Sequence, residues 1–255
     1  MKKLLICFLI LFITITGKTQ TVELPSISSD RGSMSTCPDI IIPHSLEVET
    51  GFYFKKITIE NIEQGTSLYN YNFLFRHDIS PDAEIRLQTD YAGIKEDSIK
   101  YSGFDPITIG TKINFFKGGK FLPKTSFLFN LTLPYFGENH FKPSNLAPAF
   151  YLLMQNNLSE QFSLCYNLGM ELDGESTEPS EFLSICIEYS INKFSCYMEN
   201  FNYVSSYSQP ENSVDAGIAY CIIKNLQFDI SGGINLANWK NNYFGNVGVS
   251  WRLPK

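Results

Sequence analysis

The sequence of 255 residues has few charged side chains, only three histidines, and no long apolar run beyond its first fifteen residues. Asp, Glu, Lys and Arg make up 18% of the chain, and the formal net charge is −6. This balance offers no basic face for a polyanion, so nucleic acid is not an expected partner. A membrane-spanning helix needs about 20 predominantly apolar residues, and no later stretch supplies them. No helical period is found either, which excludes a helical membrane protein.

The first twenty residues predict export. Met1-Lys2-Lys3 is followed by an apolar run from Leu4 to Ile15 and then by small or polar residues. A charged start, an apolar centre of about 7 to 15 residues and a small-residue end are typical of a secretory signal. We therefore expect residues 1–20 to be a signal peptide that is removed.

The cysteines form no recognisable framework. Cys7 lies in the predicted signal, which leaves Cys37, Cys165, Cys186, Cys196 and Cys221. An odd number without a CxxC pair argues against a disulfide scaffold and against a structural zinc site. We expect small, semi-apolar residues within strands, with no metal and no cofactor. One disulfide among the strand cysteines remains an alternative in an oxidising compartment.

What the chain does have is aromatic residues in alternating patterns. Phe and Tyr number 21 and 14, and such residues suit strands. In the stretch 122–145, Phe127, Phe129, Leu131 and Leu133 share one side of an extended chain, whereas Ser126, Asn130 and Thr132, with Leu128, share the other. Strict alternation marks a strand between two unlike environments. From Ser45 onward the pattern recurs in about twelve segments, each near the length of about 9 to 11 residues that a tilted membrane strand needs.

The connections between these segments alternate in length. Every second one is short: 78–82, 117–120, 157–161, 192–193 and 223–225. The intervening ones are longer and polar: 56–66, 92–105, 136–146, 172–180, 202–212 and 236–242. This arrangement predicts an all-β fold, a transmembrane antiparallel β-barrel of about 12 strands with short periplasmic turns and longer extracellular loops. The apolar face would contact outer-membrane lipid and the polar face would line the lumen. A soluble sandwich would reverse the two faces.

Several short motifs resemble a known family. Asp30-Arg31-Gly32, the run from Pro43 to Phe52, Arg76-His77-Asp78-Ile79-Ser80, "LTLPYFG" at 131–137 and "DISGGINL" at 229–236 are similar to motifs of the outer-membrane transporter family named for the meta-cleavage pathway of phenol degradation. The resemblance covers nearly the whole mature chain, in order. It implies an outer-membrane protein that transports small compounds, often hydrophobic ones.

Function is expected on the polar face of the strands. The predicted lumen-lining residues are Glu47, Glu49, Arg76, Glu84, Arg86, Asp90, Lys112, Asn130, Glu171, Glu188, Glu199, Asp215, Asp229 and Arg252. Their net charge of −5 would favour cations if a water path exists. The alternative is that they pair across the lumen, for example Glu84 or Asp90 with Arg86 or Lys112, and close a narrow barrel.

The chain divides into residues 1–20, a segment 21–44 that either lies beneath the barrel or plugs it, and the barrel at 45–255. The predicted function is passive transport or binding of a small solute in a bacterial outer membrane, with the outer-membrane assembly machinery as a folding partner. A surface-interaction barrel acting through its loops is the second hypothesis. An outer-membrane lipid hydrolase is a weaker one, because none of His44, His77 and His140 forms a His-x-Ser pair. No enzyme activity is expected.

Overall fold

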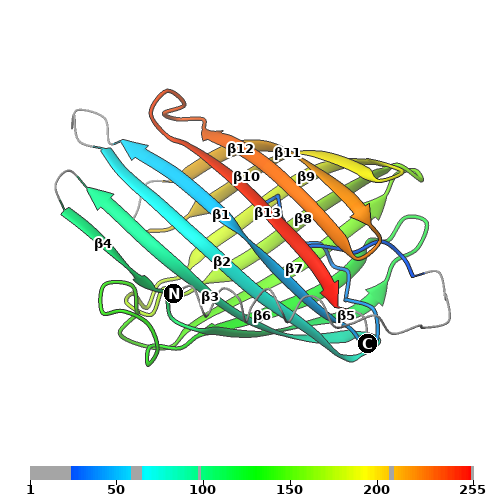
Figure 1. The fold of residues 1–255 in the computed structure, drawn as a ribbon, viewed down its shortest axis with the longest axis horizontal. Coiled ribbons are helices and arrows are strands. Elements are labelled where there is room, and N and C mark those ends of the chain that lie inside the picture. The colour runs from blue at the N-terminus through cyan, green and yellow to red at the C-terminus, as the bar shows by residue number, and fades with distance from the viewer. Residues whose placement is uncertain (1–23, 59–64, 97–98, 207–209, 254–255) are drawn as a thin grey trace, which may run out of the picture.

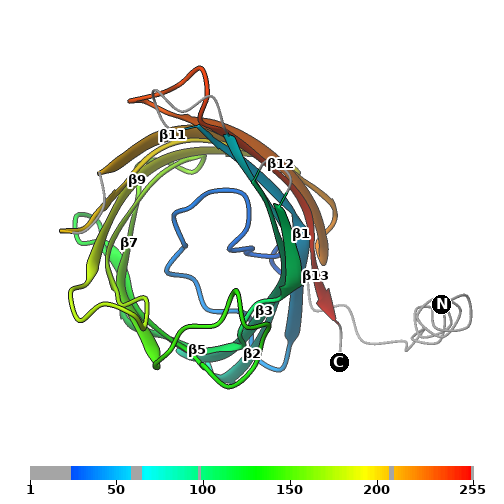
Figure 2. The same ribbon diagram turned by 90° about the vertical axis from the view of Figure 1, so that its left-hand side faces the viewer.

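The protein is a closed β-barrel, seen here in a computed structural model that describes residues 24–58, 65–96, 99–206 and 210–253. The strands are β1 Leu46–Thr58, β2 Gly65–Ser80, β3 Ala83–Glu96, β4 Ile99–Phe104, β5 Thr108–Lys117, β6 Lys124–Thr132, β7 Ala147–Asn157, β8 Phe162–Glu171, β9 Ser180–Ile191, β10 Phe194–Val204, β11 Glu211–Ile223, β12 Leu226–Asn235 and β13 Tyr243–Leu253. Neighbouring strands are antiparallel and strongly tilted (Figure 1). β1 pairs with both β2 and β13, which closes the sheet into a ring (Figure 2).

Thirteen strands make twelve positions in the wall, because β4 and β5 both pair with β3. β4 continues the ladder from Tyr91 to Glu96, and β5 pairs with the earlier part, from Ala83 to Gln88. The interruption lies at Asp105-Pro106-Ile107. Proline has no backbone N–H to donate, so the ladder cannot run through it unbroken. The structure thus confirms the predicted fold class and strand number.

One predicted connection is wrong. Residues 92–105 were expected to form a long loop, but β3 extends to Glu96 and β4 turns back along it. The alternation in this stretch is obscured by Gly93 and by charged residues near its tip, and β3 stays extended because it pairs with β2 on one side and with β4 on the other. The short turns are where the sequence predicts them, for example at Asn192, whose positive φ of 55° is a conformation that Asn tolerates.

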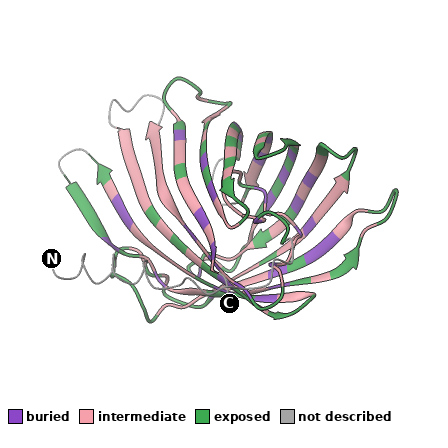
Figure 3. Ribbon diagram, turned by 45° about the vertical axis from the view of Figure 1, so that its right-hand side comes forward, coloured by how far each residue is buried: buried purple, intermediate pink, exposed green. Residues whose placement is uncertain are grey.

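The two faces of the wall differ as predicted. On β9, Leu183, Ile185 and Ile187 are about half exposed on the outside, whereas Ser184 and Cys186 between them are buried on the inside. Buried and exposed positions alternate along several other strands of the wall, whereas strands such as β1 are mostly half-buried (Figure 3). Phe127 lies on the exposed face of β6 and Leu128 on the buried one. The apolar row therefore faces outward, as required for contact with lipid. Among the described residues, no helix is long and apolar enough to span a membrane.

The interior is filled in two ways, by an aromatic cluster and by a polar loop of the chain. Near the end of the barrel that carries the longer loops (the loop end), Phe182, Phe201 and Phe244 form an aromatic cluster together with neighbouring tyrosines. The Phe201 and Phe244 rings are 5.8 Å apart between centroids. Deeper in the lumen, the chain before β1 forms a polar loop inside the ring, coloured dark blue in Figure 2. We call residues 24–45 the inner segment.

Candidate functional site

The inner segment enters and leaves the lumen at the end of the barrel that carries the short turns (the turn end). At its start, the Ile27 N–H donates to the carbonyl of Lys224 over 2.8 Å, and Arg252 Nη2 donates to the carbonyl of Pro25 over 2.6 Å. At its finish, the Ser45 N–H donates to Asp78 Oδ1 over 2.9 Å. Both ends are therefore tied to the rim, and the middle of the segment crosses the lumen.

Asp30 of the inner segment sits in a cluster of three wall cations. Lys112 Nζ lies 2.8 Å from Asp30 Oδ2, Arg86 Nη1 makes a short ion pair with the same oxygen, and Arg76 Nε lies 3.7 Å from it. Burial raises the pKa of the Asp30 carboxyl, but these three cations outweigh burial and hold the pKa below its usual value. The wall thus surrounds the Asp30 carboxylate with three cations.

The same cations are also bound to wall acids. Arg76 Nε and Arg86 Nη1 lie 2.9 Å and 3.0 Å from Glu84 Oε1, and Glu49 accepts from both Arg76 and the Asp30 N–H. Glu84 also accepts the N–H of Ile41. The proposed pairing of Glu84 with Arg86 and Lys112 is therefore present, and the inner segment completes the network.

Arg31 bonds a neighbouring part of the wall, on β2, β12 and β13. Its guanidinium donates to Asp229 over 3.1 Å and 3.3 Å, to Asn72 over 2.7 Å and to Asn246 over 2.8 Å. The wall leaves room for it at Gly248, where an added Cβ would lie 2.0 Å from Arg31 Nη2. Of these two successive residues, Asp30 thus binds cations of the wall and Arg31 binds an anion of the wall.

Residues 34–36 attach to a third part of the wall. Glu199 accepts the N–H groups of Met34 and Ser35 over 2.7 Å and 2.6 Å and makes a short bond with the Ser35 hydroxyl. Asn167 accepts the N–H of Thr36 and donates to its carbonyl. Each backbone polar group satisfied in this way avoids the cost of burial without a partner. The inner segment has no secondary structure of its own, so the wall supplies its hydrogen bonds.

The inner segment divides the lumen into two cavities. The upper cavity, towards the loop end, has a volume of about 430 Å³, and the lower cavity, towards the turn end, about 450 Å³. Their linings share only Arg31, Gly32 and Ser33. A third cavity, of about 610 Å³, lies under the loops and shares Gln88 and Asp90 with the upper one. The three form a series along the barrel, interrupted at the inner segment.

The fourteen residues predicted to line the lumen fall into two groups. Eight of them bond the inner segment: Glu49, Arg76, Glu84, Arg86, Lys112, Glu199, Asp229 and Arg252. The others line cavities or bond within the wall. Glu47 pairs with Arg76 and Arg252, Asp215 accepts from Tyr197, Glu171 accepts from Tyr151, Asp90 and Asn130 line the upper cavity, and Glu188 lines the lower one.

Sequence reasoning missed the partners of these residues on the inner segment. Asp30 and Arg31 were noticed only as part of a family motif. An acid next to a base in a stretch otherwise poor in charge was the available signal, because such a pair needs partners if it is buried. Among the described residues, no group of three or more side chains is arranged to hold a metal ion. His77 Nδ1 donates to the backbone carbonyl of Ser45 over 3.0 Å, and the His140 ring packs on Tyr101 at 4.2 Å.

A closed twelve-stranded barrel with an apolar outer face and a polar interior defines the class: the fold is that of outer-membrane channels. The structure is similar to the COG4313 outer membrane channel from Pseudomonas putida F1, with a TM-score of 0.66, 9% identity, and coverage of 89% of this chain and 100% of that one. It is also similar to the KdgM porin in complex with disordered oligogalacturonate, with a TM-score of 0.58, 11% identity, and coverage of 80% and 98%. At such identities the likeness concerns the fold.

The family is shown by sequence. The model of the family described as "Putative MetA-pathway of phenol degradation" matches residues 29–253, and the chain belongs to this family. This confirms the resemblance seen in the short motifs. No curated protein matches the chain in sequence.

Proposed function

We propose that the protein is a channel of the bacterial outer membrane that carries a small solute, and that the inner segment is a plug that must move for the solute to pass. The observation that carries this proposal is the division of one lumen into an upper and a lower cavity that meet only at Arg31, Gly32 and Ser33. In this arrangement the turn end faces the periplasm, the predicted signal at residues 1–20 directs export, and the assembly machinery inserts the barrel into lipid.

The upper cavity suits a small solute with both an apolar face and hydrogen-bonding groups. Tyr53, Tyr151 and Tyr203 contribute rings to its lining. Asn70, Gln88 and Asn130 contribute amides that can both donate and accept. Its volume lies within the range of about 300 to 1,000 Å³ that small-molecule sites occupy.

Displacing the plug would change the charge of the path. Asp229, Glu199 and Glu84 would lose the partners that the plug now provides, and the acidic excess of the wall would face water. Rings of carboxylates favour cations. We therefore infer a cation-preferring open state.

The surface-interaction hypothesis has less support, because the loop after β6 is folded back on the barrel. The Glu138 N–H donates to the carbonyl of Phe104 over 2.9 Å, and an added Cβ at Gly103 would lie 2.1 Å from the Glu138 side chain. A loop held in this way covers the third cavity rather than standing free.

Single-channel conductance in a planar bilayer tests the proposal. The refolded wild type should open rarely, and the Arg31→Ala variant should show frequent cation-selective openings in a salt gradient. Lys240→Ala, on a loop away from the lumen, is the matched control and should behave as the wild type. Silence from Arg31→Ala that is demonstrably folded would contradict the channel.

A further inference from the structure

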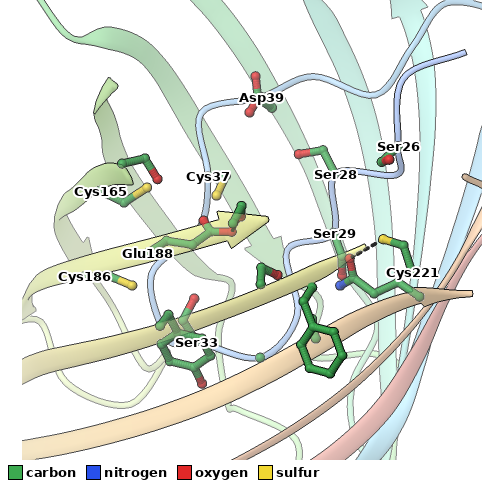
Figure 4. A pocket seen from close by; sticks show the side chains of 18 of the residues that line it. Ser26, Ser28, Ser29, Ser33, Cys37, Asp39, Cys165, Cys186, Glu188 and Cys221 are labelled. Atoms are coloured by element: carbon green, nitrogen blue, oxygen red, sulfur yellow. Dashed lines mark hydrogen bonds between the residues drawn. The ribbon is translucent and has the colours of Figure 1, made fainter. Parts of the chain in front are cut away.

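Four thiols line the lower cavity, and three of them lie where the plug meets β8 and β9. Cys37 belongs to the plug, Cys165 to β8 and Cys186 to β9 (Figure 4). Cys165 and Cys186 are direct cross-strand partners, and both are buried on the inner face. All three are free. The barrel therefore brings a thiol from the plug to a pair of thiols in the wall.

Cys37 lines the same cavity as Cys165, and the plug contacts β8 beside both of them (Figure 4). The backbone on both sides of this contact is fixed. Thr36 makes two hydrogen bonds with Asn167, two residues beyond Cys165 on β8, and Lys112 Nζ donates to the Cys37 carbonyl over 3.0 Å. A disulfide needs two Cβ atoms at about 3.5 to 4.5 Å with side chains that face one another. The hydrogen bonds of Thr36 with Asn167 hold the plug against β8 next to Cys165, which brings the two side chains into the same small space.

The other cysteines are placed differently. Cys196 is exposed on β10, whereas Cys221 on β11 lines the same cavity and its thiol contacts Gln227 Oε1 at 3.5 Å. A metal centre does not account for the cluster, because no group of three ligating side chains among the described residues is arranged to hold an ion. Thiol–disulfide chemistry is what the arrangement offers.

We propose that Cys37 and Cys165 form a disulfide that locks the plug to the wall, and that Cys186 accepts the bond from Cys37 to release it. The consequence for transport rests on the proposed channel function, whereas the disulfide site itself does not.

The locking step needs a small disulfide of the oxidised-glutathione type as oxidant. One protein thiolate attacks a sulfur of the reagent, the reagent's S–S bond breaks, and one small thiol leaves with the proton. The second protein thiolate then attacks the mixed disulfide and releases the second small thiol. Two protein thiols are oxidised and one small disulfide is reduced, so electrons and protons balance.

The release step needs no further oxidant. The Cys186 thiolate attacks the sulfur of Cys165, the Cys37–Cys165 bond breaks, and Cys37 takes up the proton that Cys186 has lost. The resulting Cys165–Cys186 bond lies within the wall and leaves the plug free. The neighbouring Cys165 thiol, together with burial, raises the pKa of the Cys37 thiol, so locking should become faster as the pH rises, because more thiolate forms.

Oxidised glutathione, applied to the full-length protein in detergent, tests the site. Peptide mapping by mass spectrometry should find Cys37 joined to Cys165. Cys37→Ser and Cys165→Ser should abolish that cross-link, Cys186→Ser should preserve it, and Cys196→Ser is the matched control with no effect. A wild type in which no Cys37–Cys165 bond forms at any time after oxidised glutathione is added, so that only a Cys165–Cys186 bond or glutathione adducts are found, would overturn the proposal.

Conductance measurements distinguish the proposed disulfide site from the proposed channel function. In the Arg31→Ala background, oxidation should lower the open probability by about tenfold or more, since a disulfide tether of this kind restricts the displaced chain strongly, and dithiothreitol should restore it. Openings that persist with the cross-link in place would overturn the lock. A cross-link in a barrel that never conducts would uphold the site and refute the channel, whereas a conducting barrel without the cross-link would do the reverse.

Discussion

Arg31 of the plug and Asp229 of β12 form a buried ion pair across the lumen, 3.1 Å between Nε and Oδ2, although 198 positions separate them in the chain. Its geometry depends on the neighbouring glycine. An added Cβ at Gly248 would be within 2.3 Å of three atoms of the Arg31 side chain and would meet none of the wall that closely. The glycine therefore makes room for the guanidinium, and the ion pair fixes the centre of the plug.

Gly248→Ala should open the channel without unfolding it. The new methyl group displaces the far end of a flexible side chain, and removing one partner from a buried pair costs about 3 to 5 kcal/mol. We expect the open probability to rise by at least about tenfold in single-channel recordings. Gly245→Ala on the same strand is the matched control, because its Cβ would have only a backbone oxygen at 3.7 Å nearby. Equal behaviour of the two variants would contradict the role given to Arg31.

The lowered pKa of Asp30 predicts that the channel opens only at acidic pH. Its pKa is lowered in the folded protein, so its contribution to plug binding is complete above the ordinary value of 3.8 and is lost as the pH falls through the lower, folded value. Conductance should stay low from neutral pH down to about that ordinary value and rise below it. Asp30→Asn should be open already at neutral pH, because the plug then loses its charged contact with three wall cations. A wild type that opens between pH 7 and 5 would show that another group controls the plug.

Asp215 and Asp229 should have different effects although both are predicted lumen acids. Asp229 binds the plug, so Asp229→Asn should raise the open probability. Asp215 accepts a hydrogen bond from Tyr197 of the wall over 3.1 Å, so Asp215→Asn should leave the open probability unchanged and weaken the cation preference of the open state. The reversal potential in a salt gradient measures that preference. If both variants changed the open probability equally, the contact between Asp229 and the plug would not control opening.

Glu199→Gln should loosen the plug around Ser35. An amide cannot accept on both of its heavy atoms, so one backbone N–H of Met34 or Ser35 would lose its acceptor, at a cost of about 1 to 3 kcal/mol. Trypsin measures the result, because Arg31 is the only Lys or Arg between positions 24 and 54. Cleavage after Arg31 should be faster in this variant than in Glu188→Gln, whose carboxylate bonds Ser190 instead. Unchanged cleavage would indicate that the plug does not depend on Glu199.

The wall could be predicted from the sequence because each strand carries its own evidence. Alternation on β9 distinguishes Leu183 from Ser184 without reference to any other strand, and the short turns follow from local residues such as Asn192. The split at Pro106 was missed, since pairing of β3 with two successive strands depends on hydrogen bonds between segments, which the local pattern does not contain.

The site could be predicted only in part. The polar faces of the strands identify Glu199, Asp229 and Lys112 as lumen residues, because position within a strand decides which way a side chain points. What they bind could not be foreseen. The inner segment has no periodicity, so nothing in its sequence states whether Asp30 meets Lys112 or Arg31 meets Asp229. Those contacts exist because the closed ring brings β3, β5 and β12 around one point.

The plug immediately precedes β1, and β1 pairs with β13, the last strand. The plug is therefore connected to the wall at the seam where the ring closes. Synthesis delivers the plug first and its wall last, so the carboxylate of Asp229 meets Arg31 only when nearly the whole chain is in place. A barrel that closes correctly therefore encloses the segment at residues 24–45 in the same step, so under the proposed function the newly folded protein starts in its closed state.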